Sequence, residues 1–91
     1  MEAKLGPAFQ RMPQLLGERV RDLRRRQGLS QGELQAIVPM TLTTLSNIER
    51  GATTDVDLSN VVALAEALGT TPDVLLGYAP LPAMPETPRT S

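Results

Sequence analysis

The residues best suited to do chemistry lie in the segment TLTTLSNIERG, at positions 41–51 of the 91-residue chain. At about 100° per residue, one side of a helix here is apolar and is formed by Leu45 and Ile48. The opposite side carries short, uncharged groups where exposed helices usually carry long charged ones: Leu42, Thr43, Ser46 and Asn47. The segment therefore predicts a helix that packs through one side and offers short hydrogen-bonding groups on the other.

Short side chains would let the axis of such a helix come close to a partner. The major groove of DNA is about 12 Å wide and admits one α-helix. There an Asn amide can pair with adenine, hydroxyls can donate or accept, and a Leu or Thr methyl can contact thymine. The residues alone leave a second interpretation open, namely an ordinary solvent-facing side of a helix that is held by its neighbours.

Other kinds of site lack their usual residues. The chain has no His and no Cys, so the common metal ligands and nucleophile–base pairs are absent. There is no glycine-rich loop to hold a phosphate. No paired spacing brings together four of the acidic residues of the second half, Asp55, Asp57, Glu66 and Asp73. We therefore expect no enzymatic activity, no metal and no cofactor.

Size and composition favour one small all-α domain. With one Phe, one Tyr and no Trp, the core must be aliphatic, which a few short helices can manage. No apolar run is long enough to span a membrane. Residues 1–50 carry 8 basic and 5 acidic side chains, net +3, whereas residues 51–91 carry 1 and 5, net −4. The excess of positive charge in the first half has two interpretations. These side chains either bind an anion or belong to a solvated arginine-rich helix face.

Five short helices are expected from the apolar spacing and from the capping residues. They run over residues 13–27, 30 to about 38, 41 to about 50, 57–68, and 70 or 71 to 76. Their expected core-facing side chains include Leu34, Ile37, Leu58, Val61, Val62, Ala65 and Leu68.

The expected domain boundaries follow from the same pattern. Residues 1–12 are expected to form a flexible N-terminal arm and residues 13–78 the folded domain. Residues 79–91 hold four of the eight prolines and are expected to form a disordered tail.

Four segments in order resemble the Xre-type, phage-repressor-like helix-turn-helix family. They are LGERVRDLRRRQGLSQGELQ at 16–35, TLTTLSNIERG at 41–51, VVALAEALG at 61–69 and TPDVLLGY at 71–78. The similarity covers about residues 16–78, and LSQ-x-x-L followed 15 residues later by Glu-Arg-Gly is fairly specific. It implies a compact five-helix domain whose third helix enters the DNA major groove.

The resemblance also implies roles for individual residues. The base-contacting positions fall on Thr41, Leu42, Thr43, Ser46 and Asn47. The phosphate-contacting positions fall on Ser30, Gln31 and Arg50. Arg24 and Glu49 match an internal ion pair with a structural role.

Departures from the family pattern bear on DNA affinity. Gln35 stands where a small residue is usual, Pro39 where the turn usually has Gly, and Leu42 where a polar or basic residue is common. The loop after Gly51, ATTDVD, carries two Asp residues in place of basic ones. Fewer phosphate contacts and added negative charge predict weak DNA binding.

These features together predict a sequence-specific DNA-binding transcriptional regulator, in the simplest case a repressor. It would bind double-stranded DNA as a homodimer on an inverted repeat, with no membrane association. The C-terminal apolar residues could form the dimer patch or complete the core: Leu75, Leu76, Tyr78 and Leu81. The alternative is a protein-interaction module of the same fold, an antitoxin or a regulator-docking subunit, with little DNA affinity. We expect a bacterial or phage-encoded protein that is cytoplasmic, and nucleoid-associated when bound.

Overall fold

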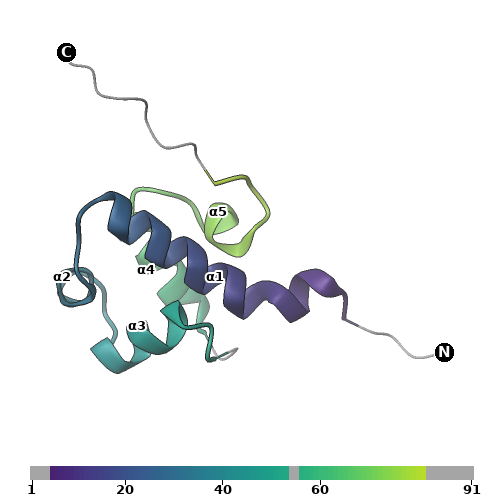
Figure 1. Cartoon of the computed structure of the whole chain (residues 1–91), viewed down its shortest axis with the longest axis horizontal. Helices are drawn as coiled ribbons and strands as arrows, with labels where there is room; N and C mark the ends of the chain where they lie inside the picture. The colour runs from purple at the N-terminus through teal and green to yellow at the C-terminus, as the bar shows by residue number, and fades with distance from the viewer. Residues whose placement is uncertain (1–4, 54–55, 82–91) are drawn as a thin grey trace, which may run out of the picture.

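The computed structural model describes residues 5–53 and 56–81, and these residues are all-α (Figure 1). The predicted five-helix fold is confirmed. The helices in chain order are α1 (Pro7–Arg26), α2 (Gln31–Gln35), α3 (Leu42–Glu49), α4 (Leu58–Ala67) and α5 (Pro72–Leu76). The long α1 crosses the whole body, with α3 on one side and α5 on another.

The first helix begins six residues before its predicted start. Pro7 occupies the first turn after the Gly6 N-cap, and Pro13, the predicted start, lies inside the helix. Proline suits a first turn because its missing N–H would have no partner there. An interior proline removes one bond to the preceding turn and usually ends a helix. Here Pro13 is buried, and the apolar spacing continues past it through Met12, which packs against the core.

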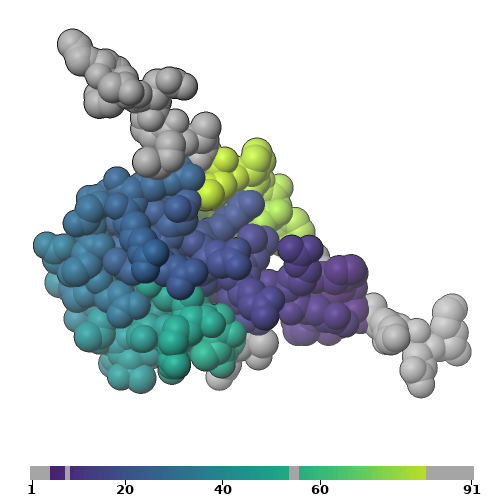
Figure 2. Space-filling view, viewed as in Figure 1, coloured from purple at the N-terminus to yellow at the C-terminus, as the bar shows by residue number. Residues whose placement is uncertain are grey.

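The boundary of the N-terminal arm therefore moves. Residues 7–12 are helical, so the prediction of a flexible arm over residues 1–12 was wrong for them. Figure 2 shows this first part of α1, in purple, projecting from the rounded body. Residues 1–4 of the predicted arm lie outside the described residues.

Side-chain caps and left-handed glycines set the ends of α2 and α3. The Ser30 hydroxyl accepts from the Glu33 N–H at 3.0 Å, and the Glu33 carboxylate accepts from the Ser30 N–H at 2.8 Å. Together these two bonds form a capping box. The Thr41 hydroxyl accepts from the Thr44 N–H at 3.1 Å and starts α3. α3 is followed by Gly51 in the left-handed conformation at φ 68°, which L side chains rarely adopt. α2 is shorter than predicted because it ends before the turn that contains Pro39.

The core is aliphatic, as its composition requires, and it lies between α1 and the other helices. Its most completely buried large side chains come from all five helices: Leu16, Val20, Leu34, Leu45, Ile48, Leu64 and Leu75.

Three residues predicted to face the core are instead exposed. Ile37 follows α2 in the turn, so the helical spacing that predicted its burial no longer applies. α4 buries Val61, Leu64, Ala65 and Leu68, which form a stripe at intervals of three and four residues. Val62 lies about 100° away from that stripe, and Leu58, in the first turn, is 73% exposed.

The C-terminal end of the described chain lies on the body. An Arg19 N–H donates to the Ala79 carbonyl at 2.7 Å, and Leu81 packs against the core. The disordered tail predicted for residues 79–91 was therefore wrong for residues 79–81, and residues 82–91 lie outside the described part. Leu75 is fully buried, so it completes the core and has no surface to offer a dimer.

Candidate nucleic-acid interface

A close backbone contact fixes α3 against α1. A Cβ atom at Gly17 would lie 2.4 Å from the Ile48 carbonyl oxygen and 2.7 Å from that of Glu49. Only glycine, which has no Cβ, lets the two helices approach this closely. The role of this residue was not predicted, although an isolated Gly inside a helical pattern is a signal for close packing. The contact sets the C-terminal end of α3, and with it the direction that its outer face takes.

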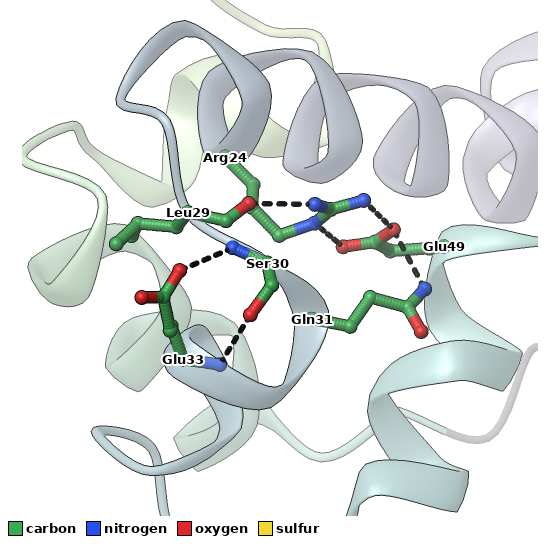
Figure 3. Close-up of polar contacts among 6 residues, drawn as sticks. All are labelled: Arg24, Leu29, Ser30, Gln31, Glu33 and Glu49. Atoms are coloured by element: carbon green, nitrogen blue, oxygen red, sulfur yellow. Dashed lines mark hydrogen bonds and ion pairs between the residues drawn. The ribbon is translucent and has the colours of Figure 1, made fainter.

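An ion pair ties the same end of α3 to α1 (Figure 3). Arg24 Nε donates to Glu49 Oε2 at 2.6 Å, and its Nη2 donates to Glu49 Oε1 at 2.9 Å. The third nitrogen, Nη1, donates to the Leu29 carbonyl at 2.7 Å. Both residues are buried, so this two-pronged contact is shielded from solvent. The structure thus gives the pair a structural place inside the domain.

The ionisation of Glu49 follows from its surroundings. Burial of the carboxyl opposes ionisation, but the hydrogen bonds from Arg24 and Gln31 and the charges of Arg24 and Arg21 outweigh it. They hold the pKa of Glu49 below its ordinary value. The hydrogen bond to Glu49 likewise raises the pKa of Arg24, against the effect of burial. Both groups are therefore charged near neutral pH.

Gln31 joins this network from the first turn of α2. Its Nε2 donates to Glu49 Oε1 at 3.0 Å (Figure 3). A carboxylate only accepts, so the nitrogen of the amide must be the atom that faces Glu49. One N–H of that nitrogen and the amide oxygen stay available to a partner. This link between α2 and α3 was not predicted, because it joins residues 18 positions apart whose distance depends on the turn.

The outer face of α3 lies open on the described surface. Leu42 is 47% exposed, Thr43 is exposed, and Ser46 and Asn47 are half-buried. Figure 2 shows the teal α3 at the edge of the molecule, with no other described segment over it in this view. An open hollow of about 300 Å³ lies here and is lined by Gln31, Leu42, Thr43, Ser46, Asn47 and Arg50.

Arg50 contacts the amide of Asn47 inside this hollow. The Arg50 Nη2 donates to Asn47 Oδ1, and because a guanidinium only donates, the amide oxygen must face it. The Asn47 nitrogen, with its two N–H groups, is then left to meet a partner. In this state Asn47 presents donors, whereas pairing with adenine requires its oxygen to accept as well.

Two of the residues expected to contact DNA lie outside the hollow. The Thr41 hydroxyl caps α3 and donates to the Thr44 hydroxyl at 3.0 Å, so it is engaged within the domain. The Ser30 hydroxyl and N–H are both used in the capping box. At this end of α2 the N–H groups of Gln31 and Gly32 have no partner within the helix.

The described ranges contain neither a metal-binding cluster nor a membrane-spanning helix. No three acidic side chains there come close enough together to hold a metal ion. No described helix has the length and apolar content needed to cross a membrane.

Comparison with known proteins agrees with this geometry. Residues 15–76 match the model of a helix-turn-helix domain family. No curated protein sequence is significantly similar to the chain. Among solved structures, the restriction-modification controller protein C.AhdI from Aeromonas hydrophila is 35% identical, with a TM-score of 0.63. The match covers 68% of this chain and 92% of that one.

Two further structures share the fold. A hypothetical transcription factor, NHTF from Neisseria, is 32% identical with a TM-score of 0.69. The match covers 84% of this chain and 85% of the NHTF chain. The P22 c2 repressor, solved in complex with a synthetic operator, is 35% identical with a TM-score of 0.63. That match covers 68% of this chain and 92% of the repressor chain. The open outer face of α3, the α2–turn–α3 arrangement and these similarities agree: this chain belongs to the helix-turn-helix family, in its phage-repressor-like, Xre-type branch.

Proposed function

We propose that this chain is a sequence-specific DNA-binding transcriptional regulator that acts as a repressor. α3 enters the major groove, and two copies of the chain bind the two halves of an inverted repeat. The protein is bacterial or phage-encoded, works in the cytoplasm and is nucleoid-associated when bound. The observation that carries this proposal is the open face of α3, whose short side chains line one hollow together with Gln31 and Arg50. The P22 c2 repressor, a relative of the same fold, was solved with an operator, which supports the same partner here.

The residues divide into two groups by their position. Thr43, Ser46 and Asn47 contact base edges, and Leu42 offers methyl groups to a thymine. Thr41, expected to contact bases, caps α3 and lies outside the hollow. Gln31 and Arg50, which line the same hollow, contact phosphates. Ser30 contributes through the N-terminal end of α2, because its own hydroxyl is engaged in the capping box.

The number of cations facing DNA argues for two copies on each site. Of the residues that line the hollow, Arg50 alone carries a positive charge. Phosphate neutralisation supplies much of the affinity of DNA-binding proteins, so a single copy binds weakly. Two-fold symmetry doubles the number of contacts and sets the half-sites about one helical turn apart.

One observation favours a second function, a protein-interaction module with little affinity for DNA, acting as an antitoxin or a regulator-docking subunit. Leu42, one of the four residues of the open face, is apolar and 47% exposed. Exposed apolar surface with a polar rim marks protein-interaction sites or ligand-binding grooves. The chain as a whole is also slightly acidic, with a net charge of −1.

A salt titration separates the two functions. Labelled duplexes from the region upstream of the protein's own gene are titrated with the protein at about 50 mM salt, and then at increasing salt. For a DNA-binding regulator we expect one fragment to bind far more tightly than the rest, with an affinity that falls steeply as salt rises. Absence of binding to any duplex at the lowest salt would favour the protein-interaction module.

A further inference from the structure

Asn47 lies in the last turn of α3, and Arg50 is the residue that ends the helix. Residues three apart on a helix share one side, and both side chains line the α3 hollow. The Gly51 N–H donates to the Ile48 carbonyl at 3.0 Å. The Ala52 N–H donates to the Asn47 carbonyl at the same distance. This pair of bonds is a Schellman motif, and it fixes the backbone that carries the two side chains.

The contact between the two side chains fixes which way the Asn47 amide points. Arg50 Nη2 donates to Asn47 Oδ1, so the amide nitrogen, with its two N–H groups, forms the branch that stays available. The oxygen has a second lone pair, but the positive charge beside it opposes the approach of another donor. In this state Asn47 is a strong donor and a weak acceptor.

The positive charge of Arg50 is available to DNA. No described carboxylate pairs with Arg50, which is exposed. A guanidinium carries five N–H groups, so Arg50 can hold Asn47 with one of them and donate to a phosphate with others. A phosphate contact of this kind would keep the guanidinium, and with it the Asn47 amide, in the same orientation on DNA.

The four bases differ in what they offer to such a side chain. In the major groove, guanine presents two neighbouring acceptors, N7 and O6, whereas adenine presents the acceptor N7 beside its N6 amino donor. Cytosine presents a donor, and thymine presents the single acceptor O4. Two donors beside a positive charge therefore match guanine best. On adenine, the N6 amino group would meet the oxygen that Arg50 already holds.

We infer that Arg50 sets the base specificity of Asn47, by directing the amide so that Asn47 reads guanine. Arg50 is then a positioning residue as well as a phosphate contact. The inference rests on the proposed function, because it identifies the base that one residue of the open α3 face selects. It differs from the usual pairing of Asn with adenine, in which the amide oxygen accepts from N6 while the nitrogen donates to N7.

Selection of bound duplexes, followed by titration, tests this inference. Selection with wild type and Asn47→Ala identifies the base pair that Asn47 reads, and we expect guanine there. Four duplexes that differ only at this pair are then titrated with wild type and Arg50→Ala by fluorescence anisotropy. Wild type should prefer guanine to adenine at least about ten-fold. Arg50→Ala should bind every duplex more weakly, and its guanine-to-adenine ratio should fall at least about three-fold because the Asn47 oxygen is freed to accept.

Gln31→Ala is the matched control. Gln31 lines the same hollow, but its amide nitrogen is bonded to Glu49. This variant should weaken binding to all four duplexes and leave the guanine-to-adenine ratio unchanged. Thermal melts check that each variant folds.

Base analogues test the contact at the level of atoms. Replacement of the guanine by 7-deazaguanine, which lacks the N7 acceptor, should weaken wild type at least about three-fold. Inosine lacks only the amino group in the minor groove and should bind as guanine does. The Asn47→Ala protein should not respond to 7-deazaguanine, whereas it would respond if Arg50 itself read this base.

Three outcomes would overturn the inference and leave the proposed function standing. They are a base other than guanine at the Asn47 position, a guanine-to-adenine ratio that survives Arg50→Ala, and an Asn47→Ala protein that still responds to 7-deazaguanine. No enriched motif from a folded wild type, or the same motif from Asn47→Ala, would overturn the inference together with the proposed reading of bases by α3.

Discussion

Glu49 is the residue through which α1, α2 and α3 are connected. Its two carboxylate oxygens accept three hydrogen bonds, two from Arg24 and one from Gln31. Arg24 in turn donates to the Leu29 carbonyl just before α2. A buried ion pair is stabilising in this setting only because each polar atom has a partner, and removal of one member leaves a buried charge uncompensated.

Glu49→Gln should therefore lower the free energy of unfolding by about 3–5 kcal/mol near pH 7. It should also change the pH dependence. The pKa of Glu49 is lower in the folded state than the value of about 4.3 for an unfolded chain. Its stabilising contribution is thus complete above that value and is lost as the pH falls through the folded-state pKa. Urea unfolding from pH 7 to pH 2.5 measures both effects. A variant with the stability and acid sensitivity of wild type would show that the network contributes little.

Arg50 is the charged residue of the α3 hollow, and its loss should have a distinctive salt signature. Arg50→Ala should weaken binding to all DNA sequences and reduce the slope of log K against log salt by about 0.9. Gln31→Ala should also weaken binding to all sequences, but with an unchanged slope because the side chain is neutral. Anisotropy titrations at several salt concentrations measure both quantities. A loss confined to one base pair in either variant would mean that the residue contacts a base.

At the scale of the helices, Gly17 controls how α3 lies against α1. A methyl group at this position would meet the carbonyl oxygens of Ile48 and Glu49, which are backbone atoms and cannot turn aside. Gly17→Ala should therefore cost about 1–3 kcal/mol of stability and displace α3, so DNA binding should fall as well.

Gly32→Ala is the matched control for this substitution. Gly32 lies inside α2 without a positive φ, and a Cβ there would meet nothing closer than 3.9 Å. Alanine should be neutral or stabilising by up to about 1 kcal/mol at such a site. Thermal melts compare the two variants. A Gly17→Ala protein as stable as the Gly32→Ala protein would contradict the close contact of the two helices.

Local signals were enough to predict most helix ends. Ser30 with Glu33, Thr41, and the glycines at 28, 51 and 69 each act within a few residues of their position, so their effects can be recognised from the sequence. The start of α1 could not be predicted in this way because two prolines, Pro7 and Pro13, both suit a first turn. The choice between them depends on the packing of Pro13 and Met12 against the rest of the core.

The open face of α3 could likewise be predicted, and its connections could not. Helical spacing alone placed Leu42, Thr43, Ser46 and Asn47 opposite Leu45 and Ile48. The bond from Gln31 to Glu49 depends on the turn between α2 and α3, which contains Pro39 and varies in geometry. The bond from Arg50 to Asn47 depends on side-chain rotamers, which spacing does not determine.

At the scale of the whole molecule, the α3 hollow has one positively charged lining residue, Arg50. Under the proposed function, a second copy on the same DNA site doubles the phosphate contacts without a change in the recognition face.

Selection of bound duplexes from a random pool at about 100 mM salt, with wild type and Asn47→Ala in parallel, tests the central claim most directly. That claim is that the open face of α3 reads DNA bases. Wild type should enrich an inverted repeat. Asn47→Ala should enrich the same repeat with one position relaxed in each half, at a cost of about 1–3 kcal/mol and with an unchanged melting temperature. An identical motif from both proteins, or no enriched motif from a folded wild type, would contradict the account.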